Sequence, residues 1–303
     1  GAWLLIPSHP ASASGERFDW PGAALMVAVI VMAIVALNQL TRQGVAHAGP
    51  WLAAGVTAAL TLAFIKRQLA VSEPIIELRL FRNRLFATAN LTHVLVNCAS
   101  FSIMLLVPFY LSRALGGDVA GVGIYLAVYP LGAMAASLFA RAGLERLGAV
   151  NLSQIGLGMA ACGLLMISFS PASLESIEAS VMVVGALALH GFGYGLFQVA
   201  AVDVVMATMP RTQQGVGGSL NMLTRTLGVV AGASFGSILF AGLGGGAEAD
   251  TTTFHAAYAV VFRIACALVL LAMGMLALIS RRDTREADQD PRGKDKCGEN
   301  DFT

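Results

Sequence analysis

Long runs of apolar residues alternate with short polar stretches along most of the chain. Eight runs approach or exceed the roughly 20 apolar residues that a helix needs to cross a bilayer. They span 21–40, 50–65, 85–111, 121–140, 150–170, 179–208, 215–243 and 255–280. Apolar side chains surround each predicted helix instead of forming one stripe, which is typical of helices in lipid. The pattern predicts an all-α membrane protein with eight transmembrane helices.

The composition supports a membrane protein and excludes several other classes. Only 12% of the 303 residues are charged and 56% are hydrophobic, whereas soluble domains average about 25% charged residues. The net charge of +1 gives no indication of nucleic-acid binding. The four Cys residues are scattered singly, which argues against a disulfide scaffold or a structural zinc site, and we expect no bound metal.

We also expect that the chain is not an enzyme. It contains no HExxH, Walker or GxGxxG signature. A Gly-x-Ser-x-Gly match at 232–236 falls inside a predicted membrane helix. The nucleophile of a hydrolase needs a strand–turn–helix context instead.

The basic residues indicate which side of the membrane each loop faces. Of the 19 Lys and Arg residues, 15 lie in every second loop, namely 1–20, 66–84, 141–149, 209–214 and the tail 281–303. The alternate loops carry two, Arg42 and Arg113. Because cytoplasmic loops are rich in Lys and Arg, we expect a multi-pass membrane protein with both termini in the cytoplasm.

The same pattern divides the chain into five parts. A cytoplasmic leading segment (1–20) is followed by two helices (21–65), a cytoplasmic loop (66–84), six helices (85–280) and a cytoplasmic tail (281–303). The loop mixes basic and apolar residues, so it is either a segment on the inner membrane surface or a solvated linker. The tail is polar and is expected to be disordered. The chain starts with a short apolar stretch and no Met, so we interpret it as a fragment.

Four stretches match a known family in order and spacing. They read FDWPG at 18–22, EPIIELRLFRNR at 73–84, LVPFYL at 106–111 and, within 210–228, NMLTRTLG at 221–228. From about residue 16 to 281 the chain resembles the fourteen-helix drug:proton antiporters of the major facilitator superfamily (EmrB/QacA type). The resemblance implies that 21–65 holds the two central helices of that fold. It also implies that 85–280 is the complete six-helix C-terminal half.

The resemblance further implies a location in the bacterial inner membrane and a function. The expected activity is export of drugs or other small lipophilic molecules by alternating access, driven by a proton gradient and without a cofactor. The expected partners are a small-molecule substrate, the lipid bilayer and a missing N-terminal half, and a periplasmic adaptor is a further partner that this family allows. The alternative is a non-transporting membrane module or the remnant of a broken transporter gene.

One loop motif of the family has a partial counterpart. The family pattern Gly-x-x-x-Asp-Arg-x-Gly-Arg aligns with 141–149, where Glu145, Arg146 and Gly148 match. Arg141 replaces the leading Gly and Ala149 the closing Arg, which puts a gating role in question. We expect this loop to offer an ion pair to a neighbouring helix end.

Polar residues within the predicted spans are candidates for function because they are expensive in lipid. On helix 85–111, the side chains of Asn90, His93, Asn97 and Ser100 share one arc. A polar stripe in lipid faces another helix or a wet cavity. It either lines the substrate path, with His93 able to exchange a proton near neutral pH, or only makes hydrogen bonds between helices.

Helix 215–243 carries Asn221, Arg225, Gly228, Gly232 and Gly236 on one face. Glycines four residues apart allow a neighbouring backbone to approach closely, so they present Arg225 toward protein. A coupling or gating role for Arg225 and a purely structural pairing both remain open.

Asp203 and Arg225 are the oppositely charged residues on the predicted cytoplasmic side of neighbouring spans. Their depths of roughly 9 and 15 Å predict an interaction, direct or through water, that holds the two helix ends together. Arg263 lies about two turns inside the last span and either snorkels outward or faces a cavity.

Aromatic residues accompany the polar positions of helices 121–140 and 179–208. Gly191, Gly195 and Gln198 share a face near Tyr194 and Phe197, while Tyr125 and Tyr129 lie one turn apart. Aromatic side chains beside a polar cavity suit flat lipophilic or cationic drugs, and ordinary packing is the alternative for each of them. We expect His190 to be packed without titrating.

Overall fold

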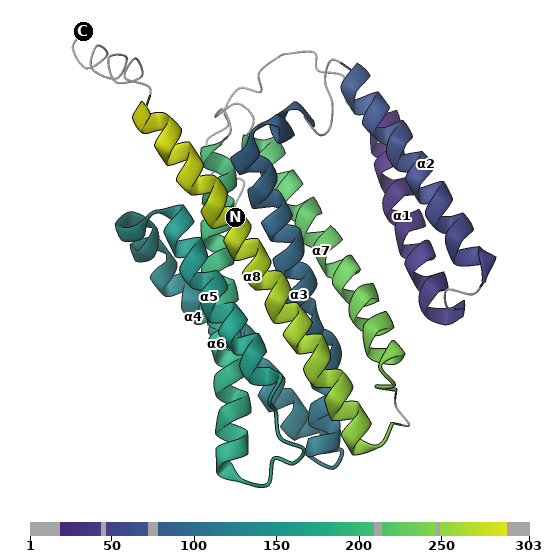
Figure 1. The fold of residues 1–303 in the computed structure, drawn as a ribbon, viewed down its shortest axis with the longest axis vertical. Helices are drawn as coiled ribbons and strands as arrows, with labels where there is room; N and C mark the ends of the chain where they lie inside the picture. The colour runs from purple at the N-terminus through teal and green to yellow at the C-terminus, as the bar shows by residue number, and fades with distance from the viewer. Residues whose placement is uncertain (1–18, 44–46, 72–77, 209–213, 247–248, 290–303) are drawn as a thin grey trace, which may run out of the picture. The chain divides into compact units, whose positions relative to one another are not determined.

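The computed structural model describes residues 19–43, 47–71, 78–208, 214–246 and 249–289, and these residues form helices and their connections without a strand (Figure 1). The helices are α1 (Trp20–Gln43), α2 (Ala48–Ala70), α3 (Arg84–Ala114), α4 (Val119–Leu147), α5 (Ala149–Ile167), α6 (Ile177–Ala207), α7 (Gln214–Gly242) and α8 (Thr251–Gln289). A short 3-10 helix spans Leu78–Arg82. All eight α-helices are long and apolar enough to cross a membrane, which confirms the predicted spans.

Three helices extend well beyond their predicted C-terminal ends. Helix α4 continues to Leu147, so most of the predicted loop 141–149 is helical. Helix α2 continues to Ala70, so the predicted loop 66–84 begins with helical residues, and its residues 72–77 lie outside the described part. Helix α8 continues to Gln289, so the expectation of a disordered tail is wrong for 281–289. Arg, Glu, Ala and Gln are good helix formers, and they extend α8 past its apolar run. Residues 1–18 and 290–303 also lie outside the described part.

The chain divides into two compact units, residues 1–78 and 79–303, and each is described by itself. In the first, α1 and α2 form an antiparallel pair. The buried Asp19 carboxylate accepts hydrogen bonds from the Gly22 N–H at 2.9 Å and from Arg67 Nη2 at 2.7 Å. Asp19 therefore caps α1 and ties it to the end of α2. The hydrogen bond from the Arg67 guanidinium lowers the pKa of the Asp19 carboxyl.

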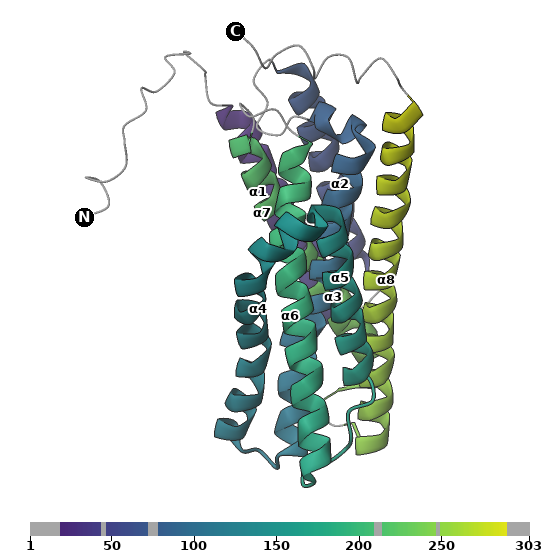
Figure 2. The same ribbon diagram turned by 90° about the vertical axis from the view of Figure 1, so that its left-hand side faces the viewer.

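The second unit is a bundle of α3 to α8 (Figures 1 and 2). Helix α6 packs against α4 and α5, helix α3 packs against α7 and α8, and α5 contacts α8. Large apolar side chains fill the space between α3, α5, α6 and α8, among them Leu106, Leu164, Phe197, Tyr258 and Phe262. This core fixes the positions of α3 and α6, on which the polar groups described below lie.

Glycine residues determine how closely the helices approach. A Cβ atom at Gly228 would lie 2.6 Å from the Val94 carbonyl oxygen of α3, closer than real side chains come. Gly232 and Gly236, which the sequence places on the same face of α7, also lie against α3. Close backbone approach of this kind is typical of helix contacts in membranes. Glycines serve the α4–α6 and α5–α6 contacts in the same way.

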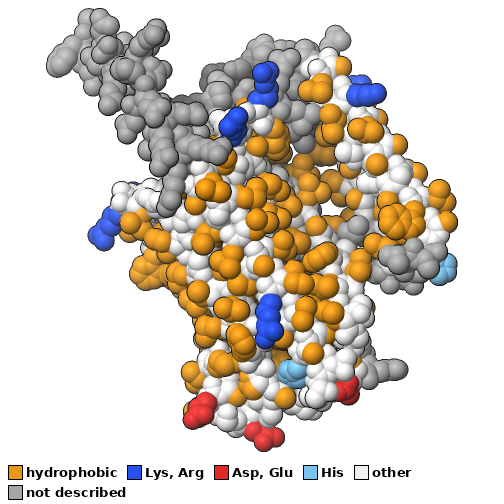
Figure 3. Space-filling view, in the orientation of Figure 1, with side chains coloured by type: hydrophobic (Ala, Val, Ile, Leu, Met, Phe, Trp, Pro, Cys, Tyr) orange, Lys and Arg blue, Asp and Glu red, His pale blue; other side chains and the backbone are white. Residues whose placement is uncertain are grey.

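Most of the flank of the α3–α8 unit is apolar, although a basic side chain lies within it (Figure 3). Acidic side chains gather at the end that holds the α3–α4, α5–α6 and α7–α8 connections. At that end Asp250 caps α8, because its Oδ2 accepts hydrogen bonds from the Thr252 hydroxyl and from the Thr253 N–H. These bonds lower the pKa of Asp250 to about 2.

Candidate functional site

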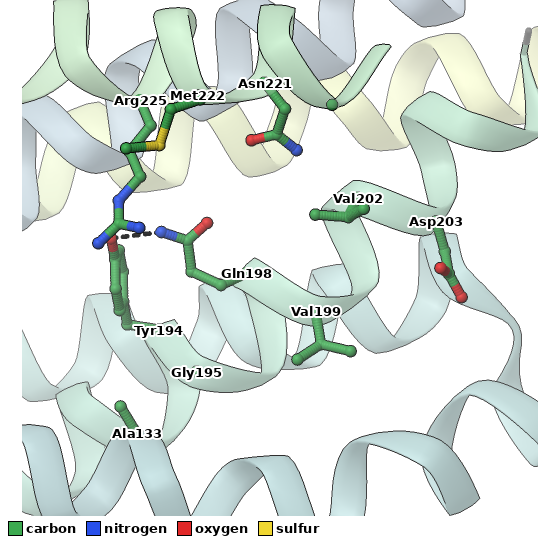
Figure 4. A pocket seen from close by; sticks show the side chains of 11 residues that line it. Ala133, Tyr194, Gly195, Gln198, Val199, Val202, Asp203, Asn221, Met222 and Arg225 are labelled. Atoms are coloured by element: carbon green, nitrogen blue, oxygen red, sulfur yellow. Dashed lines mark hydrogen bonds between the residues drawn. The ribbon is translucent and has the colours of Figure 1, made fainter. Parts of the chain in front are cut away.

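A cavity of about 640 Å³ lies between α6 and α7, with one residue of α4 on its wall (Figure 4). Its size is within the range of roughly 300–1,000 Å³ that is typical of small-molecule sites. Its lining consists of Ala133, Tyr194, Gly195, Gln198, Val199, Val202, Asp203, Gly218, Asn221, Met222 and Arg225. Four of the predicted site residues, Gln198, Asp203, Asn221 and Arg225, therefore meet at one place.

The polar groups of this cavity come from facing turns of α6 and α7. The Arg225 guanidinium lies beside the Tyr194 hydroxyl, and the Gln198 amide points into the space between the helices (Figure 4). Gln198 Nε2 donates a hydrogen bond to the Tyr194 hydroxyl oxygen. The Asn221 side chain is buried, and its Nδ2 has no hydrogen-bond partner among the described residues. The cavity thus combines amide and guanidinium donors with apolar walls.

A chain of hydrogen bonds connects the cavity to the polar stripe of α3. The Tyr194 hydroxyl donates to Asn97 Oδ1 at 2.7 Å, and Asn97 Nδ2 donates to the His93 carbonyl oxygen at 2.7 Å. His93 and Asn97 are each 1% exposed. His93 Nε2 has no hydrogen-bond partner among the described residues. This chain joins α3 to α6 without placing His93 or Asn97 on the cavity wall.

The rest of the stripe also lies in contacts within the protein. Asn90 donates to the Phe86 carbonyl oxygen of its own helix at 2.9 Å. Ser100 lies 3.2 Å from His190 Nε2, and His190 Nδ1 lies 2.9 Å from the Ala160 carbonyl oxygen. Because a carbonyl only accepts, Nδ1 carries the proton and Ser100 donates to Nε2. The hydrogen-bonding interpretation of the stripe therefore describes this structure, and His190 is fully buried with both ring nitrogens satisfied.

Asp203 and Arg225 form no direct ion pair, which was one of the two predicted forms of their interaction, the other being contact through water. The ion pairs among the described residues are Arg67–Asp19 and Arg141–Glu145. In Figure 4 the Asp203 carboxylate points away from the cavity centre, while Arg225 extends toward Tyr194. Five residues separate Asp203 from Gln198, which turns it to another face of α6. The two charges share a cavity without contact.

The remaining candidates lie away from this cavity. The Arg263 guanidinium stacks over the Phe169 ring at 5.3 Å, outside the cavity lining. Glu145 pairs with Arg141 one turn earlier on α4 at 3.1 Å, so the expected ion pair to a neighbouring helix end is not formed. Arg146 is exposed, and Gly148 turns the chain between α4 and α5 with a φ of 77°.

Other residues of interest gave little signal in the sequence. Ala133, Val202 and Met222 line the cavity, but apolar residues in an apolar helix cannot be distinguished from lipid-facing ones by pattern. In the sequence, Arg113 contributes only to the number of basic residues in the loops. It donates hydrogen bonds to the Ala249 carbonyl oxygen at 3.0 Å and the Gly246 carbonyl oxygen at 3.3 Å, beside a second cavity of about 450 Å³.

Comparison with known proteins gives consistent matches. A family model described as Major Facilitator Superfamily matches residues 89–299. The chain is 29% identical over 239 residues to the uncharacterized transporter YebQ of Escherichia coli (strain K12), covering 78% of this chain and 51% of that protein. It is 27% identical over 318 residues to the multidrug resistance protein B homolog of Mycobacterium tuberculosis (strain ATCC 25618 / H37Rv), covering 93% and 58%. The chain thus spans about half the length of the curated relatives it matches.

A solved structure shows the same fold. The nucleoside transporter NupG superimposes with a TM-score of 0.57 at 14% sequence identity, over 84% of this chain and 65% of that one. At this identity the similarity concerns the arrangement of helices alone. It supports the assignment of an all-helical membrane fold.

Proposed function

This chain belongs to the Major Facilitator Superfamily, and we propose that it forms the substrate-binding wall of a proton-driven exporter of small lipophilic molecules. The family is one of membrane transporters and not of enzymes, in agreement with the sequence analysis. The observation that carries the proposal is the cavity between α6 and α7, where Arg225, Asn221 and Gln198 meet apolar side chains. A wall of this composition binds an amphiphilic molecule by its apolar body and orients it by a few polar contacts.

Two further features support the proposal. A similar protein carries the name multidrug resistance protein B homolog. The uneven distribution of basic residues favours cytoplasmic termini and an inner-membrane location. Export by alternating access needs a second surface facing the cavity, which a further six-helix segment or a second copy would supply. The proton gradient as energy source belongs to the proposal through the resemblance to drug:proton antiporters.

Everted membrane vesicles from a bacterium that expresses the gene for this chain provide the test. Respiration acidifies such vesicles, and a pH-sensitive dye reports any proton release that accompanies substrate uptake. Ethidium, norfloxacin and 2-naphthoate serve as cationic, zwitterionic and anionic probes. We expect at least one of them to dissipate the pH gradient in these vesicles and not in vesicles that lack the protein. A steady gradient with all three probes would contradict the proposed function.

A further inference from the structure

The α6–α7 cavity holds a positive charge that no acidic side chain balances among the described residues. Arg225 projects into the cavity from α7, and the two ion pairs found among the described residues do not include it. Asp203 is the acidic residue of the lining, and its carboxylate is turned away from Arg225 (Figure 4). A guanidinium inside a membrane span is costly unless a polar or charged group compensates it. The cavity is therefore suited to a negatively charged ligand.

Asn221 provides an independent observation at the same place. It lies one turn before Arg225 on α7 and is 9% exposed, and its Nδ2 has no hydrogen-bond partner among the described residues. Figure 4 shows its amide directed into the cavity, with the oxygen toward Gln198 and the nitrogen on the side of Val202. A buried donor without an acceptor destabilises the protein. An oxygen acceptor on a bound molecule would remove this cost.

The other walls of the cavity limit the shape of that molecule. Tyr194 contributes an aromatic ring, while Val199, Val202 and Met222 contribute apolar surface. A carboxylate matches the planar fork of donors on a guanidinium and accepts two hydrogen bonds from it. We propose that the cavity selects flat apolar substrates that carry a carboxylate, with Arg225 binding the charge and Asn221 donating a further hydrogen bond. The inference rests on the proposed function, because it names the substrate class of the same site.

A carboxylate substrate differs from the cationic drugs that the aromatic residues of the sequence favoured. Tyr194 is the aromatic side chain that the lining supplies, and the Arg225 guanidinium lies beside its hydroxyl. A cationic ligand at this position would meet a like charge. Electrostatics at Arg225 therefore outweighs the attraction that an aromatic ring offers to a cation.

The test measures binding of three matched probes to the purified 303-residue chain in nanodiscs of phosphatidylcholine. The probes are 2-naphthoate, its neutral amide 2-naphthamide, and a naphthyl-trimethylammonium cation, which share one ring system. A hydrogen bond to a charged group contributes enough to change affinity roughly tenfold or more. We expect 2-naphthoate to bind at least about tenfold more tightly than the amide, and the cation to bind most weakly.

Substitutions connect this preference to individual side chains. Arg225→Gln should abolish the preference for 2-naphthoate over the amide, and Arg225→Lys should retain part of it because the charge remains. Asn221→Leu should weaken 2-naphthoate binding while Arg225 still favours the anion. Arg263→Gln is the matched control, since it removes an arginine of a membrane helix that lies outside the cavity. If Arg225→Gln fails to fold, the ratio of the 2-naphthoate affinity to the amide affinity in Arg225→Lys still tests whether Arg225 binds the carboxylate.

Anionic lipids carry the same chemistry in their phosphate groups, so a second set of nanodiscs contains phosphatidylglycerol. Unchanged binding of 2-naphthoate there supports a free carboxylate substrate, and its loss would assign the site to a lipid headgroup and overturn the inference. Equal or tighter binding of the amide or the cation would also overturn it while leaving the cavity as a binding site. Binding of none of the three probes would instead count against the proposed function.

Discussion

Replacing Gly228 with alanine should push α7 away from α3 and destabilise the bundle. The new Cβ atom would lie 2.6 Å from the Val94 carbonyl oxygen and 2.8 Å from Asn97 Cβ. Ordinary van der Waals contact needs about 3.5 Å, so the two helices must separate locally by roughly 1 Å. The first atom met is backbone, which cannot rotate away as the end of a flexible side chain can.

The expected magnitude follows from two opposing effects. Overpacking of this kind costs about 1–3 kcal/mol, and the upper part of that range applies because a backbone atom opposes the methyl group. Alanine is favoured over glycine within a helix by about 1 kcal/mol. The net loss should be about 1–2 kcal/mol, which corresponds to a decrease in Tm of roughly 2–8 °C for a unit of this size.

Thermal unfolding of the purified protein measures the change, and the thiol of Cys98 offers a local readout. Cys98 lies on α3 where Gly232 of α7 approaches it, so its labelling rate should rise when the helices separate. A background without the other three cysteines makes the signal specific. The control is Gly158→Ala on α5, where a Cβ atom meets nothing within 4 Å.

The control should be as stable as the wild-type protein or more stable, because it gains helix propensity without a clash. If Gly228→Ala resembles Gly158→Ala in both Tm and Cys98 labelling, the close α3–α7 contact described above does not exist in the protein. The reasoning about glycine packing would then be wrong for this helix pair. A loss of stability in both variants would point to a general effect of alanine and would equally refute the argument.

Three further predictions concern topology, pH and charge coupling. A single Cys at Glu175 should react with an impermeant maleimide in intact spheroplasts, and one at Arg146 only after the cells are opened; the reverse pattern would invert the orientation. Asp250, whose pKa is lowered from 3.8 to about 2, stabilises the fold above its ordinary pKa, and this contribution disappears as the pH falls toward 2. Unfolding curves should therefore show Asp250→Asn to be less stable at neutral pH, with a smaller decline between pH 4 and 2 than in the wild-type protein. Asp203→Asn and Arg225→Gln should change the free energy of unfolding additively within about 0.5 kcal/mol; a coupling above about 1 kcal/mol would show that the two charges do interact.

The hydrophobic pattern was sufficient to predict the spans, because helix length and lipid exposure both depend on local sequence. The predicted ends agree with the helices to within a few residues except where a helix continues beyond the apolar run, as at Ala70, Leu147 and Gln289. Helical periodicity predicted that Gly228, Gly232 and Gly236 share a face, since spacing alone decides which residues of a helix do so. The neighbour that this face meets, α3, required the structure.

Contacts between helices were harder to predict, because they depend on rotations and side-chain directions that no single helix encodes. The depths of Asp203 and Arg225 below the inner helix ends predicted that the two residues lie near each other. Their side chains nevertheless point in different directions (Figure 4). Helical periodicity predicted the polar stripe of α3 that contains Asn97, but it did not decide whether this stripe faces water or protein. The bond from Tyr194 to Asn97 shows that it meets protein, and no signal in either helix identified that partner.

The glycine contacts also restrict how this protein can evolve. Every single-nucleotide change of a glycine codon that alters the residue introduces a larger one or a stop codon. At positions such as Gly228, Gly156 and Gly193, a larger residue would meet backbone atoms of the opposite helix. Under the proposed function, new substrate ranges would therefore arise elsewhere, at residues such as Val202 and Met222, whose codons reach side chains of several sizes while the scaffold stays unchanged.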